Sequence, residues 1–142
     1  MLLIGSDPLT QFLNRAAETP FAWGQFDCLL WLADWIAERG GVDPALGLRG
    51  CYSTMLGAAR IVADAGGMVA LVEGRVELAG VSRAACGARG DIAVIDIAGD
   101  GGEQFGNQAG AILLGGTAVF LSQAGLLILQ RSEINLVAAW RV

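Results

Sequence analysis

The stretch FAWGQFDCLLWLADWIAE, residues 21–38, predicts a helix that begins at a single cysteine, Cys28, directly after an aromatic turn containing glycine. Asp27 is suited to cap this helix because its carboxylate can accept hydrogen bonds from the first backbone N–H groups, and Gly40-Gly41 ends it near Arg39. Its apolar residues occupy several sides of the helix and are Leu29, Leu30, Trp31, Leu32, Ala33, Trp35, Ile36 and Ala37. A helix of this kind belongs in the middle of a domain.

Further helices are predicted in the first half of the chain. Ser6 or Asp7 followed by Pro8 is a typical helix start. The run YSTMLGAARIVADAGG, residues 52–67, predicts a helix that ends at its glycine pair, and MVALVEGR, residues 68–75, predicts a short helix after it.

After residue 90 the pattern changes to short apolar runs that are typical of strands. The five runs are DIAVIDI (91–97), AGAILL (109–114), TAVFLS (117–122), GLLILQ (125–130) and LVAAWRV (136–142). The widest break, AGDGGEQFGN at residues 98–107, lacks the spacing of a phosphate-binding glycine motif and is interpreted as a surface loop. Helices followed by consecutive strands predict a single α+β domain over residues 1–142. Its central helix is expected to pack on a C-terminal antiparallel sheet of about five strands.

Charge and hydropathy narrow the range of partners. The net charge is −5, and the nine basic residues are arginines scattered along the sequence, whereas proteins that bind nucleic acid gather basic residues into a stripe. The uncharged segment 104–130 is long enough to span a bilayer, but Gly115-Gly116 and residues 122–125 divide it into pieces of strand length. We therefore expect no nucleic-acid partner and no membrane span, and the N-terminus lacks the basic flank of a signal peptide.

The cysteine content predicts free thiols. Cys28, Cys51 and Cys86 are odd in number, lack C-x-x-C spacing, and have no histidine in the chain to complete a zinc site. We expect reduced, unbridged thiols in an intracellular protein, with no metal and no cofactor.

Three motifs occur in a fixed order: FAWGQFDC at residues 21–28, RGDIAVID at residues 89–96 and QAGAILLGG at residues 108–116. This ordered set resembles the NlpC-type cell-wall peptidases, a bacterial branch of the papain-like fold. The resemblance implies a papain-like NlpC-type fold with Cys28 at the position of the nucleophile. It puts Gln108 at the position of the catalytic histidine, and the third catalytic residue would fall near residues 121–123.

Cys28 has two interpretations. A helix N-terminus favours a thiolate, but a papain-like enzyme also needs an imidazolium partner, and Gln108 cannot carry a proton. Cys28 is then a vestigial nucleophile that packs as a small buried residue, or a working one that borrows a base from another subunit. For the tryptophans, core packing is favoured over a sugar-binding groove; they are Trp23, Trp31, Trp35 and Trp140.

The chain ends AWRV, Ala139–Val142. Together with the W-G-x-x-D-C and G-D motifs, this ending resembles small phage and prophage proteins of tail gene modules. The resemblance implies an inactive structural or assembly protein of the phage tail tip, or baseplate. Other tail subunits, and possible contact with peptidoglycan, are the partners it implies, and the virion tail or the host cytoplasm during assembly is the location.

Two other functions are carried as alternatives. The first is a cysteine hydrolase of peptidoglycan that uses Cys28 as an endopeptidase or amidase nucleophile, and the second is a host immunity or inhibitor module. The apolar C-terminal strands predict self-association or binding to a tail-hub protein. Arg89, Asp91 and Arg141 are expected to pair at the sheet edge.

Overall fold

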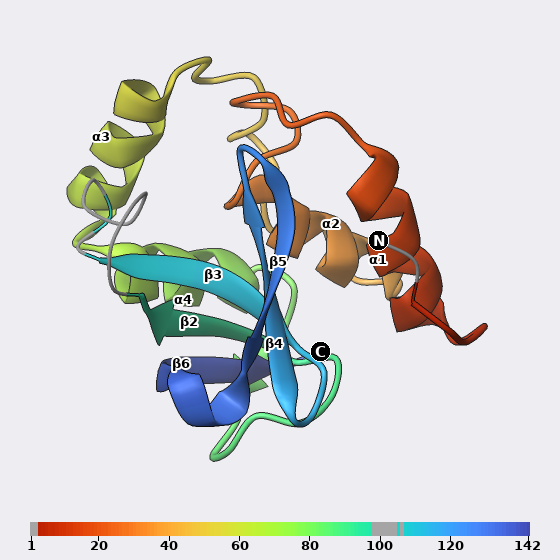
Figure 1. Cartoon of the computed structure of the whole chain (residues 1–142). Coiled ribbons are helices and arrows are strands. Elements are labelled where there is room, and N and C mark those ends of the chain that lie inside the picture. The colour runs from red at the N-terminus through yellow and green to blue at the C-terminus, as the bar shows by residue number, and fades with distance from the viewer. Residues whose placement is uncertain (1–2, 98–104, 106) are drawn as a thin grey trace.

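The computed structural model describes residues 3–97, 105 and 107–142 of the chain. Four helices come first in the sequence and pack beside a sheet formed by the rest of the chain (Figure 1). The helices are α1 (Pro8–Glu18), α2 (Leu30–Glu38), α3 (Met55–Ala65) and α4 (Met68–Glu77). The strands are β1 (Ser82–Arg83), β2 (Ile92–Asp96), β3 (Gln108–Leu113), β4 (Thr117–Ser122), β5 (Gly125–Gln130) and β6 (Asn135–Arg141), with a 3-10 turn, η2 (Arg131–Glu133), before β6.

The sheet has the strand order β1-β6-β2-β3-β4-β5, and every neighbouring pair is antiparallel. The predicted α+β class is therefore confirmed, and all five predicted strands form. The expected number of about five strands is corrected to six, because β1 adds a short edge strand that pairs Ser82 with Arg141 and Arg83 with Trp140. Most of the predicted loop at residues 98–107 lies outside the described residues.

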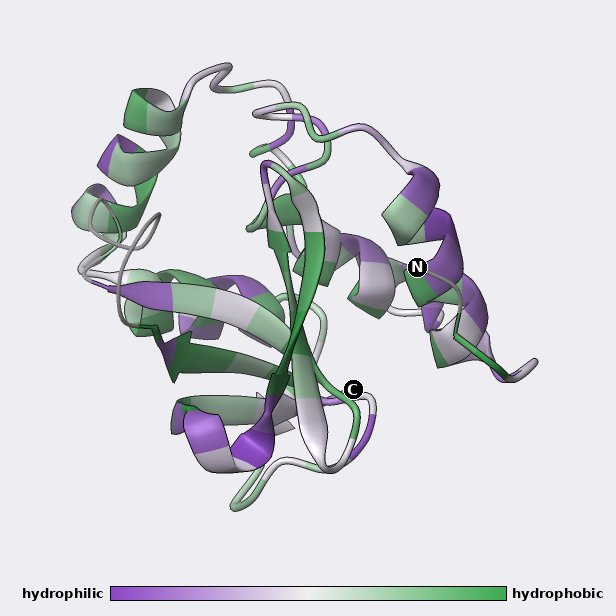
Figure 2. Ribbon diagram, viewed as in Figure 1, coloured by the Kyte–Doolittle hydropathy of each residue, from purple (hydrophilic) through white to green (hydrophobic). Residues whose placement is uncertain are grey.

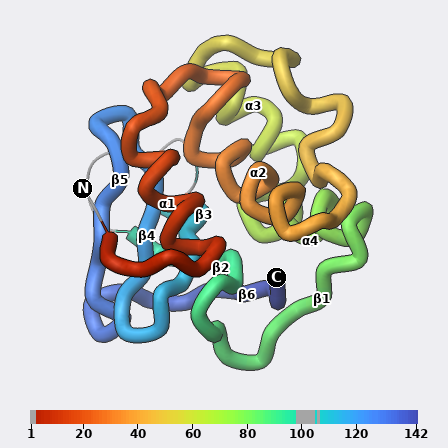
Figure 3. Tube along the Cα trace, turned by 90° about the vertical axis from the view of Figure 1, so that its right-hand side faces the viewer, coloured from red at the N-terminus to blue at the C-terminus, as the bar shows by residue number. Residues whose placement is uncertain are grey.

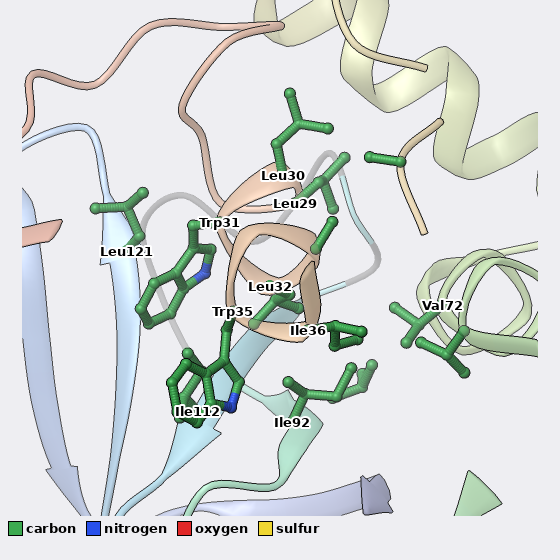
Figure 4. Close-up of a cluster of buried hydrophobic side chains, with 14 of the residues drawn as sticks. Leu29, Leu30, Trp31, Leu32, Trp35, Ile36, Val72, Ile92, Ile112 and Leu121 are labelled. Carbon is green, nitrogen blue, oxygen red and sulfur yellow. The ribbon is translucent and has the colours of Figure 1, made fainter. Parts of the chain in front are cut away.

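Helix α2 is the centre of the main core. It lies against one face of the sheet, with its side chains directed at Ile92, Ile112 and Leu121 (Figure 4). Trp31 is fully buried, and Trp35 donates a hydrogen bond from its indole Nε1 to the carbonyl of Gly90 at 2.8 Å. The prediction of a central helix that is apolar on several sides is confirmed, because sheet, α1 and α4 side chains all contact it.

The opposite face of the sheet is also buried. It carries a second cluster of mostly small side chains, which are Ala93, Ile95, Ala111, Leu113, Ala118 and Ala139. In Figure 1 the hairpin of β4 and β5 runs across the direction of β2 and β3, which shows how strongly the sheet twists. Burial on both faces explains why β2 begins with four apolar residues, 92–95, before the exposed Asp96, and Figure 2 shows most of this strand as hydrophobic.

The uncharged segment that raised the question of a membrane span folds as sheet. Residues 108–113, 117–122 and 125–130 form β3, β4 and β5, and the other view of the chain shows α1 lying against β5 (Figure 3). Among the described helices, none alone has both the length and the apolar composition to cross a membrane. Helices α3 and α4 have the required length and composition only when they are counted together, and the chain bends by 77° between them.

Asp91 fastens the end of the chain to the start of β2. Its side chain is 1% exposed and accepts hydrogen bonds from the Ala88 N–H at 2.8 Å, Arg141 Nε at 3.0 Å and the Val142 N–H at 3.3 Å. The expected Asp91–Arg141 pair is therefore present. Arg89 does not join it and instead contacts Asp7 at 3.2 Å, at the start of α1.

We predict that Asp91→Ala lowers the free energy of unfolding by about 1–3 kcal/mol, because it removes the three hydrogen bonds that a buried carboxylate accepts. Urea denaturation followed by circular dichroism measures the change. Asp64→Ala, an exposed acid in α3, is the matched control and should change stability by less than about 0.5 kcal/mol. Equal effects of the two substitutions would contradict the structural role of Asp91.

Candidate functional site

The site is built around the buried carboxylate of Asp27. Asp27 is 0% exposed and accepts four hydrogen bonds from three parts of the chain. One oxygen accepts from the N–H groups of Leu29 and Leu30, both at 2.9 Å, at the start of α2. The other accepts from the Gly24 N–H at 2.8 Å and from the Tyr52 hydroxyl at 2.6 Å. The aromatic turn, the helix start and the segment around Tyr52 are thus held by one side chain.

Gly24 is required where the turn meets this segment. Its φ of +81° lies in the left-handed region, and a Cβ at this position would sit 1.9 Å from the carbonyl oxygen of Tyr52. Only glycine fits both the backbone conformation and the close approach. The W-G part of the motif therefore has a structural cause that is independent of any catalysis.

Cys28 follows the capping carboxylate directly. It lies in the turn before α2, so the helix begins two residues later than the predicted start at Cys28. The side chain is partly buried, and burial, reinforced by the adjacent Asp27 carboxylate, raises the pKa of the Cys28 thiol to about 12. The helix N-terminus therefore does not produce a thiolate at neutral pH.

Gln108 faces the same side of the sheet as Cys28. It is the first residue of β3, and side chains two positions apart on a strand share a face. At the next position on that face, Gly110, a Cβ would lie 3.3 Å from the carbonyl oxygen of Cys28 and 2.5 Å from Leu32 Cδ1. Glycine thus lets β3 pass close to the start of α2. Gln108 Nε2 makes a long hydrogen bond of 3.4 Å to Asp96 on the neighbouring strand.

Cys28 and Gln108 line one pocket with a volume of about 260 Å³. Its wall is aromatic: Phe21 and Trp23 meet edge to face with ring centroids 4.8 Å apart, and Phe105 lies 6.5 Å from Trp23. The rest of the lining comes from Met55, Met68, Ile97, Ala109, Gly110, Phe120, Leu121 and the turn between β4 and β5. The pocket brings together the two site residues that the resemblance selects, but whether Cys28 is a vestigial nucleophile stays a prediction.

The segment where the resemblance implies a third catalytic residue, 121–123, contains no base. Residues 121–123 line the pocket, but Leu121 is buried in the main core. The Ser122 hydroxyl donates to the Gly125 carbonyl at 2.8 Å and accepts from the Ala124 N–H at 3.2 Å, which closes the turn between β4 and β5. Neither Leu121 nor the amide of Gln123 can take up a proton near neutral pH.

The tryptophans divide between core and pocket. Trp31, Trp35 and Trp140 are buried, and only Trp23 among them lines the pocket. The predicted preference for core packing is confirmed for the three buried rings, and these rings are not available as a sugar-binding platform.

The cysteine content predicted free thiols and no metal site. Cys28, Cys51 and Cys86 are all free, which confirms the predicted absence of bridges within the chain. Within the described part of the chain, no three cysteine, aspartate or glutamate side chains gather as a metal site requires.

Tyr52 is the site residue that sequence reasoning missed. It is the only tyrosine in the chain and comes from a region without a recognisable motif. Burial and the hydrogen bond to Asp27 raise the pKa of Tyr52, so its hydroxyl stays protonated and acts as a donor. It therefore supports Asp27 and cannot replace the missing base.

We predict that Tyr52→Phe lowers the free energy of unfolding by about 1–3 kcal/mol, because it removes a donor to a buried carboxylate. Chemical denaturation gives the value, with Cys51→Ser as a control on an exposed neighbour. A loss no larger than that of the control would show that the hydrogen bond does not hold the site.

We also predict that the Cys28 thiol alkylates slowly. In a Cys51→Ser, Cys86→Ser background, iodoacetamide at pH 8 should react roughly a thousand times more slowly than with free cysteine, because so little thiolate is present. A raised pKa means that the rate keeps rising with pH beyond pH 10, whereas the rate for free cysteine levels off earlier. An inflection below pH 8.5 would contradict the buried, protonated thiol.

Comparison with known proteins gives a family but no activity. No curated protein and no solved structure matches the chain. The family model described as a domain of unknown function, DUF6950, matches residues 6–142, which is nearly the whole chain. The protein therefore belongs to the DUF6950 family.

Proposed function

We propose that this protein is a non-catalytic structural or assembly component of a phage or prophage tail tip, built on a papain-like NlpC-type fold. The observation that supports a non-catalytic role is the composition of the pocket. Cys28 and Gln108 both line it, and the chain has no histidine that could take the place of Gln108. The order of elements supports the fold assignment, because a central helix preceded by Asp-Cys packs against the strand that begins at the histidine position.

Chemistry at Cys28 would need two things that this site lacks. The nucleophile must be a thiolate, and the pKa of about 12 keeps the thiol protonated near neutral pH. The leaving amine must also receive a proton from a positioned acid, and the sequence contains no histidine to supply it. General acid–base help is typically worth about 10²–10⁴ in rate. These deficits weigh against the alternative of a peptidoglycan hydrolase.

The assignment to a phage tail rests on the resemblance to small tail-module proteins and on an exposed apolar strand at the edge of the sheet. Strand β5 lies at the sheet edge and pairs only with β4. Its side chains Leu127 and Ile128 are 46% and 40% exposed. An apolar edge strand is a template for pairing with another chain, which suits a subunit that works inside an assembly.

The catalytic half of the proposal is tested with purified peptidoglycan. We predict that the wild-type protein and Cys28→Ala release the same background amount of soluble fragments, measured by chromatography of the digest. An active NlpC-type peptidase serves as the positive control. If the wild-type protein releases more soluble fragments than Cys28→Ala, the hydrolase is favoured over the proposal. The same holds if this difference appears only when a partner protein supplies a histidine.

The assembly half is tested by co-expression with a tail-hub protein from the same phage or prophage, which the proposal requires. Co-purification should survive Cys28→Ala and weaken in Ile128→Lys, because a lysine on an edge strand opposes pairing. Leu46→Lys, at a residue that is 70% exposed outside the sheet, is the matched control. A stable monomer that does not bind the tail proteins would contradict the proposed role in assembly.

A further inference from the structure

The pocket beside Cys28 has the properties of a binding site rather than of a packing gap. A cavity of about 150 Å³ lined by apolar side chains can hold benzene. The present pocket, at about 260 Å³, has room for a larger group, such as a fused ring. Three of its aromatic rings hold one another in place along one wall, because Trp23 packs against Phe21 on one side and Phe105 on the other.

The described lining carries no charged side chain. Its polar groups are the Cys28 thiol and the side chains of Gln108, Ser122 and Gln123. The Ser122 hydroxyl is committed to the turn between β4 and β5. Gln108 uses its Nε2 toward Asp96, which leaves its carbonyl oxygen as an acceptor. Asp96 itself does not line the pocket and is held by Asn135 Nδ2 at 2.7 Å.

We infer that the pocket binds a neutral aromatic or branched aliphatic group and rejects charged ones. The inference rests on the proposed function in that the site is a binding pocket and not a hydrolytic centre. An apolar group gains free energy by leaving water for this lining. A charged group would lose its hydration without meeting an opposite charge in the described lining, and that cost is large in an apolar site. The raised pKa of Cys28 has the same cause, because burial also disfavours its thiolate.

Indole and two charged relatives test this preference. Indole is titrated into the full ¹⁵N-labelled chain, and the same is done with tryptamine, a cation, and indole-3-acetate, an anion. We predict saturable shifts for the Trp23 indole N–H, the Gln108 side-chain amide and the Gly110 N–H. The two charged compounds should bind at least tenfold more weakly than indole.

Matched substitutions on α3 locate the binding. Met55→Lys puts a cation at the pocket rim and should weaken indole at least tenfold while improving indole-3-acetate. Leu56→Lys places the same charge on the next residue, which is 60% exposed and outside the lining. It should leave indole binding unchanged. Gln108→Glu, nearly isosteric, is a second variant that should weaken indole-3-acetate and favour tryptamine.

The source of the group is distinguished by N-acetyl-tryptophanamide, a neutral mimic of a peptide-borne side chain. Tighter binding than indole points to a peptide ligand, and binding of indole alone points to a free small molecule; either outcome supports the inference. Three results would overturn it: no saturable shift, equal affinity for charged and neutral probes, or equal effects of Met55→Lys and Leu56→Lys. Cleavage that depends on Cys28 would defeat the proposed function and leave these binding results to be judged separately.

Discussion

The buried carboxylate of Asp27 is the interaction on which the rest of the structure depends. A charge removed from water is costly unless hydrogen bonds replace its hydration, and Asp27 receives four from the turn, the helix start and Tyr52. Those bonds set where α2 begins and how it enters the core. The position of α2 then decides where Trp31 and Trp35 pack, how closely β3 passes, and where the Cys28 side chain points.

A second buried acid, Asp91, has the same kind of role at the other end of the fold. It joins the start of β2 to the last two residues of the chain, while the carbonyl of the preceding Gly90 accepts from Trp35 on the central helix. The Asp-Cys and Gly-Asp motifs that resemble those of a peptidase therefore contain residues with a structural role. These residues are Asp27, Gly90 and Asp91. These residues stabilise the fold whether or not the cysteine beside them does chemistry.

The elements that could be predicted from the sequence are those that local chemistry determines. Asp7 and Pro8 start α1, Thr54 caps α3, and left-handed Gly66 ends α3. Strand β1 was not predicted, because its two residues have no apolar pattern and form a strand only by pairing with β6. The pocket could not be predicted in detail either, because Phe21, Met55 and Phe105 line it from segments far apart in the sequence. Gln108 was found because its motif has a fixed place in the order of elements.

The proposed loss of catalysis and the proposed preference for a neutral ligand both follow from one environment. The apolar lining that suits an uncharged ring also opposes a thiolate, and the Asp27 carboxylate that holds the turn opposes it further. A histidine at position 108 would meet the same lining, where desolvation favours its neutral form over the imidazolium that a thiolate needs. Replacing Gln108 alone would therefore supply a base without the charge separation that activates the nucleophile. In the proposed function the site therefore differs from that of a cysteine peptidase in its whole lining, and the absence of histidine is the part of that difference that the sequence shows.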